Sequence, residues 1–154
     1  MKSLSLIHEF LALSRFAFVG VSRNPKAFSR MLFQDFIRRG YEVLPVNPYA
    51  RDIEGIPCVP SFDKIIPLPA AALIMASNDS TKRLVRECCQ AGVSLLWVYG
   101  ISGPKSMAPE VLRITEEYGT RLIPSYCPYM FFRDSSWCHR MHTSAWKFVG
   151  LYPK

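Results

Sequence analysis

The sequence predicts an α/β fold built on a doubly wound, parallel, five-stranded sheet with an additional C-terminal helical tail. Short apolar runs typical of buried strands alternate along the chain with amphipathic segments of helical periodicity. Residues 70–76 form an unbroken apolar run, as expected for a central strand that is covered on both faces. The strand-helix-strand spacing favours right-handed parallel crossovers. At 154 residues, the chain is large enough for one domain with its own core.

Strands are predicted where apolar runs are bounded by turn residues, and helices where apolar residues recur every three or four positions. The first helix is expected to lie against the sheet edge. The predicted helices span residues 4–13, 25–39, 78–91 and 107–118, and the predicted strands span residues 16–19, 42–46, 70–76, 95–99 and 121–124. Glycines follow three of these helices and are expected to end them: Gly40, Gly92 and Gly119. The proline-rich residues 49–69 predict a surface connection with a short helical turn at 62–65.

The segment from residue 16 to residue 26 runs from a buried strand through Gly20 into a helix. Asn24 is a favoured N-cap, and Pro25 suits the first helical position because its missing N–H costs nothing there. Unpaired amides at a helix N-terminus attract phosphate through hydrogen bonds and the helix dipole. The third glycine of the dinucleotide fingerprint is absent, so the pattern is typical of a phosphate-binding turn and equally of an ordinary strand-to-helix turn.

The composition is that of a globular protein, with 49% hydrophobic and 20% charged residues, which argues against a disordered chain. A net charge of +7 favours an anionic partner, either nucleic acid or a phosphorylated cofactor. The same charge is also consistent with a role in solubility alone. No apolar run reaches the length of a membrane span. The five cysteines lack regular pair spacing, so we expect reduced thiols and a cytoplasmic location.

A ligand site is expected outside the carboxyl ends of the strands, near the point where strand order reverses. The residues predicted at those ends are Gly20, Ser22, Asn47, Ser77, Asn78, Tyr99, Gly100 and Cys127. NAD-binding sheets usually place an acidic residue at the end of the second strand, where this chain has Val46, Asn47 and Pro48. An uncharged corner tolerates a phosphate on the ribose, and Arg23 and Lys26 supply positive charge on the opposing loop.

Several motifs occur in an order that resembles the stand-alone CoA-binding domain family, which is similar to the nucleotide-binding domain of the succinyl-CoA ligase alpha subunit. They are Gly20 to Pro25, Gly40 to Pro48, Ile53-Glu54-Gly55, Gly92-Val93 through Trp97, and Cys127-Pro128. The resemblance covers roughly residues 12–128 and implies a Rossmann-like fold with coenzyme A as cofactor. It further implies that Gly20, Ser22 and Lys26 lie at the phosphates, that Val46, Asn47 and Pro48 lie near the adenosine, and that Ser77, Asn78 and Tyr99 line the cleft.

Two segments depart from the family's pattern. Residues 76–79 replace a proline-rich turn after the third strand, and Tyr129 to Phe132 stand where an acidic residue is common. We expect the second departure to put apolar bulk near the cleft.

The predicted function is non-catalytic binding of CoA or acyl-CoA. A succinyl-type ligase needs a phosphate-carrying histidine from a second domain, and the cleft motifs hold none, since the histidines are His8, His139 and His142. No catalytic residue is assigned, and whether the protein is an enzyme stays open. The alternatives are an NAD(P)-binding Rossmann protein or a subunit of a larger enzyme. Charge alone suggests nucleic acid, which we do not expect as a partner.

The C-terminal tail lies beyond the residues that resemble the family. Residues 1–128 are expected to form the CoA-binding domain, and residues 129–154 an extension that packs on the domain, on a second copy in a homodimer, or on another protein. Trp137, Met141 and Phe148 would form the apolar stripe of its helix. Cys138, His139 and His142, with or without Cys127, match no zinc-binding spacing, so no metal site is predicted.

Overall fold

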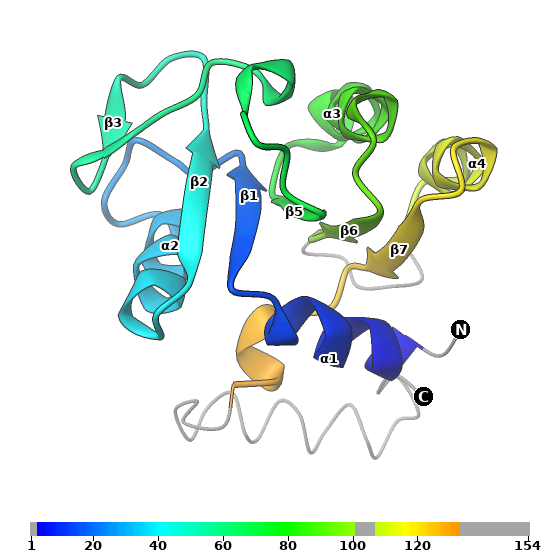
Figure 1. Ribbon diagram of the computed structural model, residues 1–154, viewed down its shortest axis with the longest axis horizontal. Coiled ribbons are helices and arrows are strands. Elements are labelled where there is room, and N and C mark those ends of the chain that lie inside the picture. The colour runs from blue at the N-terminus through cyan, green and yellow to red at the C-terminus, as the bar shows by residue number, and fades with distance from the viewer. Residues whose placement is uncertain (1–2, 101–106, 133–154) are drawn as a thin grey trace.

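Parallel strands form a central sheet with helices on both faces in the computed structural model, which describes residues 3–100 and 107–132 (Figure 1). The five strands lie in the order β2-β1-β5-β6-β7, and all neighbouring pairs are parallel. Strand order reverses between β1 and β5, because the chain first moves from β1 to β2 on one side and then returns to β5 on the other. The predicted doubly wound α/β architecture is therefore confirmed.

The elements agree with the predicted ones in type and order. The strands of the sheet are β1 (Arg15–Val19), β2 (Glu42–Val46), β5 (Ala71–Ile74), β6 (Leu95–Val98) and β7 (Arg121–Pro124). The α-helices are α1 (Ser3–Ala12), α2 (Phe28–Arg38), α3 (Asn78–Ala91) and α4 (Pro109–Glu117). Two short 3₁₀ helices, η1 (Phe62–Lys64) and η3 (Pro128–Met130), also lie in the described part of the chain, and η1 fulfils the prediction of a helical turn. As expected, α1 contacts the edge strand β7.

The core consists of two layers separated by the sheet. Alternation along β1 sends Phe16 and Phe18 into the layer under α1 and α2, and Ala17 and Val19 into the layer under α3 and α4. The first layer is aromatic, and Trp97 lies within it with no solvent exposure. Helices α1 and α2 cover one face of the sheet, and α3 and α4 cover the other (Figure 1). A surface that α3 lines therefore lies on the opposite side of the sheet from α2.

The start of α2 differs from the prediction. The helix begins at Phe28 with Ala27 at the N-cap position, so Asn24 does not cap it and Pro25 lies outside it. The Asn24 side chain instead accepts a hydrogen bond from the Lys26 N–H at 3.0 Å. Short polar side chains often compete in this way with helical hydrogen bonding, and here they extend the loop after β1 by three residues.

A two-stranded hairpin, β3 (Asp52–Ile53) with β4 (Ile56–Pro57), lies within the segment predicted to be irregular. Its two turn residues, Glu54 and Gly55, have positive φ angles of 54° and 75°, as a tight two-residue hairpin requires. Glycine is the usual residue there, whereas glutamate is not, which is why the sequence pattern did not reveal the hairpin.

The end of the described chain packs into the core under α1 and α2. Tyr129 and Phe132 are buried there, the Tyr129 hydroxyl donates a hydrogen bond to Asp35, and the Arg39 guanidinium lies 4.1 Å from the centroid of the Phe132 ring. The packing of the domain thus continues at least to residue 132. The predicted tail stripe of Trp137, Met141 and Phe148 lies outside the described residues.

Candidate functional site

A cleft of about 1110 Å³ opens at the carboxyl edge of the sheet, beside the point where strand order reverses. Its walls are the loop after β1, the residues that end β2 and β5, the segment that leads into η1, and one side of α3. Clefts of this kind at the switch point are the usual ligand sites of doubly wound sheets. Six of the predicted site residues line it: Gly20, Ser22, Arg23, Val46, Asn47 and Pro48.

Asn47 and Arg23 tie the two loops at the cleft rim together. The Asn47 Nδ2 atom donates to the Val21 carbonyl at 2.9 Å, while its Oδ1 atom accepts from the Tyr49 N–H at 2.8 Å. The Arg23 guanidinium reaches the Tyr49 carbonyl at 3.5 Å. The side chain at the end of β2 is therefore engaged within the protein on both of its polar atoms, and Arg23 places a cation on the rim.

Gly20 is required by the packing of two neighbouring strands. Its φ angle is +94°, and a Cβ atom added there would lie 1.9 Å from the Met75 carbonyl oxygen. The resemblance implies that Gly20 lies at the phosphates. The close approach that the structure describes at Gly20 is to the backbone just after β5, and both segments line the cleft.

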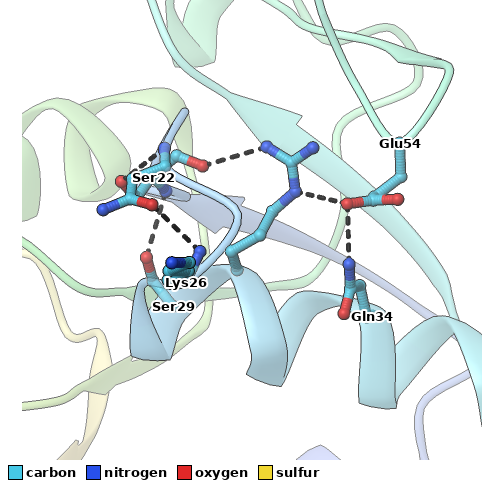
Figure 2. A network of polar contacts seen from close by, with 7 residues as sticks. Ser22, Lys26, Ser29, Gln34 and Glu54 are labelled. Atoms are coloured by element: carbon cyan, nitrogen blue, oxygen red, sulfur yellow. Dashed lines mark hydrogen bonds and ion pairs between the residues drawn. The ribbon is translucent and has the colours of Figure 1, made fainter.

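The loop after Gly20 is ordered by its own side chains (Figure 2). The Ser29 hydroxyl accepts from the Ser22 N–H at 3.0 Å, and the Ser22 hydroxyl accepts from the Asn24 N–H at 3.1 Å. In the part of the chain that the structure describes, no group accepts a hydrogen bond from the Arg23 N–H. This amide and the Arg23 guanidinium are among the donors that the loop offers to an anion, and Lys26 is a further cation in the same loop.

Sequence reasoning missed the wall on the far side of the cleft, made by η1 and α3. Phe62 and Leu84 supply apolar surface, Arg83 pairs with Glu87 at 2.6 Å, and Asp63 lies beside them. Hydrogen bonds from the Ser61 and Lys64 side chains hold the pKa of Asp63 below its usual range, so this carboxyl is ionised at neutral pH. The three- and four-residue spacing along 80–87 was the available signal, because it puts those residues on one side of the predicted helix.

The other predicted site residues lie elsewhere. Lys26 is exposed farther along its loop than the residues that line the cleft, Ser77 is the N-cap residue of α3, and Gly100 follows β6. For Asn78, the structure gives the start of α3. The Tyr99 ring stacks on Phe28 with centroids 5.5 Å apart. Neither Tyr99 nor Cys127 lines the cleft.

The Tyr99 hydroxyl and the Cys127 thiol are hydrogen-bonded and poorly ionised. Burial, followed by the neighbouring thiol, raises the pKa of Tyr99 to about 12, and burial also raises the pKa of Cys127. This pair therefore has the character of packing groups, and the Cys127 thiol has little thiolate character. Tyr129, Phe131 and Phe132 pack in the α1–α2 layer of the core and do not line this cleft, which corrects the expectation of apolar bulk there.

Within residues 3–100 and 107–132, no three His, Cys, Asp or Glu side chains are grouped so as to hold a metal ion. Cys138, His139 and His142 lie outside those residues. The four described cysteines are free thiols, and none of the described helices is long and apolar enough to cross a membrane.

Comparison with known proteins gives relatives that act on CoA. The ADP-forming acetate–CoA ligase II alpha subunit of Pyrococcus furiosus is 26% identical over 118 residues, which are 72% of this chain and 26% of that protein. The ADP-forming acetate–CoA ligase I of Archaeoglobus fulgidus is 28% identical over 118 residues, again 72% of this chain but 17% of the relative. The chain thus spans about a quarter or less of the length of these curated relatives.

A solved structure of similar size shares the fold. A conserved hypothetical protein from Pyrococcus furiosus superposes with a TM-score of 0.64 at 27% identity, covering 71% of this chain and 91% of its own. The family model of the CoA binding domain matches residues 14–133, which include every strand and the whole cleft wall. The resemblance seen in the motifs is therefore confirmed, and the chain belongs to the CoA-binding domain family.

Proposed function

We propose that this protein binds CoA or acyl-CoA in the cleft at the carboxyl edge of the sheet, as a non-catalytic binding module. The observation that carries the proposal is the position of the cleft, which opens at the switch point beside the Gly20–Arg23 turn in a chain of the CoA-binding domain family. A ligand with a nucleotide half and several phosphates matches a cleft of this size with a cationic rim.

The two sides of the cleft suit the two ends of an adenosine phosphate. The unpaired Arg23 N–H and the Arg23 guanidinium are donors for phosphate oxygens at the turn after β1. Val46, Phe62 and Leu84 supply the apolar surface against which a base can pack. We therefore orient the ligand with its phosphates at the turn and its base between β2 and α3.

The end of β2 favours CoA over NAD. A ribose-binding carboxylate is absent there, and Asn47 uses both polar atoms of its side chain in bonds to the loops. The relatives named above are acetate–CoA ligases of which this chain spans only a part, and the cleft-lining residues of the described chain include no histidine. We accordingly propose that the protein presents its ligand to a partner, either a second copy or another subunit.

CoA is expected to raise the melting temperature more than NAD does. A ligand that binds only the native state at 100 times its Kd adds about 2.7 kcal/mol of stability. For a domain of this size, that corresponds to a shift of roughly 5–10 °C. Thermal unfolding with matched concentrations of CoA, NAD and adenosine measures the difference. Equal shifts with CoA and NAD, or none with CoA, would overturn the proposal.

Arg23→Gln is expected to weaken CoA binding by roughly 10- to 100-fold, the scale of a lost charge-assisted hydrogen bond to phosphate. Isothermal titration calorimetry measures the two affinities. Arg86→Gln is the matched control, because it removes the same charge from an exposed position of α3 that does not line the cleft. Lys26→Gln tests the second predicted cation. A Kd for Arg23→Gln equal to that of the control would place the phosphates elsewhere.

A further inference from the structure

Arg30 joins three separate segments, and Figure 2 draws its bonds to the Glu54 carboxylate and to the carbonyl of the cleft-lining Ser22. Arg30 lies in the first turn of α2. Its Nε atom donates to the Glu54 carboxylate at 2.5 Å, and its Nη1 atom donates to the Ser22 carbonyl at 3.2 Å. Gln34 donates to the same Glu54 oxygen at 2.7 Å. The helix, the tip of the β3–β4 hairpin and the loop after β1 are thus held together by one guanidinium.

Glu54 occupies a backbone conformation that is costly for a residue with a Cβ atom. Its φ angle of 54° lies in the left-handed region, where a residue with a Cβ atom is disfavoured. The Arg30 side chain is only 14% exposed, so the pair is partly shielded from water. The hydrogen bond from Arg30, followed by that from Gln34, lowers the pKa of Glu54, and the carboxylate stays charged at neutral pH.

The bond to Ser22 fixes the orientation of one peptide group. The Ser22–Arg23 peptide is trans and planar, so its N–H points opposite to its carbonyl. Because Arg30 holds the carbonyl towards α2, the Arg23 N–H points away from that helix. The cleft is walled by α3 on the other face of the sheet, and both Ser22 and Arg23 line it.

We propose that Arg30, held in place by Glu54, is a positioning residue that keeps the Arg23 N–H aimed into the cleft, where it donates to a phosphate of the bound nucleotide. This inference rests on the proposed function, since it names how that site recognises phosphate. We do not expect Arg30 to contact the ligand. It holds the Arg23 N–H in the orientation that binds phosphate, so the amide does not have to reorient when the nucleotide binds.

The chain offers a matched control at the opposite end of the sheet. Arg15 also joins a carboxylate and a carbonyl, with bonds to Glu42 at 3.0 Å and to the Pro67 carbonyl at 2.9 Å. It lies at the start of β1, away from the cleft. Arg15→Gln therefore removes the same kind of bridge without affecting the loop.

The experiment compares Arg30→Gln, Glu54→Gln and Arg15→Gln with the parent protein, using CoA and adenosine as probes. Calorimetry is expected to show a roughly tenfold weaker Kd for CoA in the first two variants and no change in the third. Adenosine, which has no phosphate, is expected to bind all four proteins equally. Arg30→Lys is expected to restore little, because a single ammonium lacks the fork that reaches both acceptors.

Hydrogen exchange of the amides of residues 20–26 in the ligand-free proteins supplies a readout that needs no ligand. We expect faster exchange in Arg30→Gln than in Arg15→Gln. An unchanged CoA affinity in Arg30→Gln, or an equal loss for CoA and adenosine, would overturn the inference. If the parent protein binds no CoA, the proposed function fails and the phosphate contact fails with it. The loop exchange then decides only the positioning of the loop by Arg30: faster exchange supports it, and unchanged exchange refutes it.

Discussion

Gly20→Ala is expected to prevent folding or to lower the free energy of unfolding by at least about 4 kcal/mol, an exceptional cost for one methyl group. The added Cβ would lie 1.9 Å from the Met75 carbonyl oxygen, so β1 and β5 would have to separate at the switch point. Closely packed interiors do not yield to such a displacement without losing neighbouring contacts. Urea-induced unfolding, followed by circular dichroism, measures the change.

Gly40→Ala separates the two sources of this cost. Gly40 has a similar φ angle of +88°, but a Cβ atom there would meet nothing within 4 Å. It therefore reports the backbone strain alone, which we expect to cost about 1 kcal/mol. A Gly20→Ala protein as stable as the Gly40→Ala protein would show that the contact between the two strands is easily relieved.

Asn47→Asp is expected to cost about 2–3 kcal/mol at neutral pH, because a donor to the Val21 carbonyl is replaced by a negatively charged acceptor. The nearby carbonyl oxygen would raise the pKa of the new carboxyl in the folded protein above its unfolded value. The penalty is then complete above the folded pKa and disappears as the pH falls below the unfolded pKa, about 3.9. The variant should regain stability in acid relative to the parent.

Unfolding of both proteins at several pH values between about 4 and 8 measures this difference. Gln90→Glu adds the same charge at an exposed position of the cleft rim and is the control. Its stability relative to the parent should vary little over that range, since an exposed carboxyl keeps its ordinary pKa. A penalty for Asn47→Asp that does not depend on pH would mean that the new carboxylate turns away from the Val21 carbonyl.

The strands of the sheet could be predicted because burial determines which types of residue they contain. A strand covered on both faces must be apolar throughout, which identified β5, and Gly92 ended α3 in the left-handed conformation that favours glycine. The parallel order follows from the alternation of strands and helices. The carboxyl-edge position of the site follows from that topology, and this brought Gly20, Ser22 and Asn47 to the cleft.

The remaining features depend on contacts between residues far apart in the chain. Glu54 stands where the two-residue turn requires a positive φ angle, and Arg30, 24 positions earlier, holds its side chain, so no local pattern identifies this glutamate as a turn residue. Helix α2 begins three residues later than predicted because the Asn24 side chain accepts a hydrogen bond from the Lys26 N–H within the loop. Tyr99 and Cys127 follow strands like the true cleft residues, yet the ring of Phe28 packs on Tyr99 and leaves it outside the cleft.

The pairing at the outer side of β2 limits how a partner can dock. Val59 donates to the Pro45 carbonyl at 2.9 Å and accepts from the Asn47 N–H at 3.0 Å, and Pro45 has no N–H to offer. The outward backbone groups of Pro45 and Asn47 are thus already used or missing, and the carboxyl half of this margin offers little to an additional strand. We therefore expect a partner that receives the ligand at the cleft to recognise side chains there and not to extend the sheet from that end of β2.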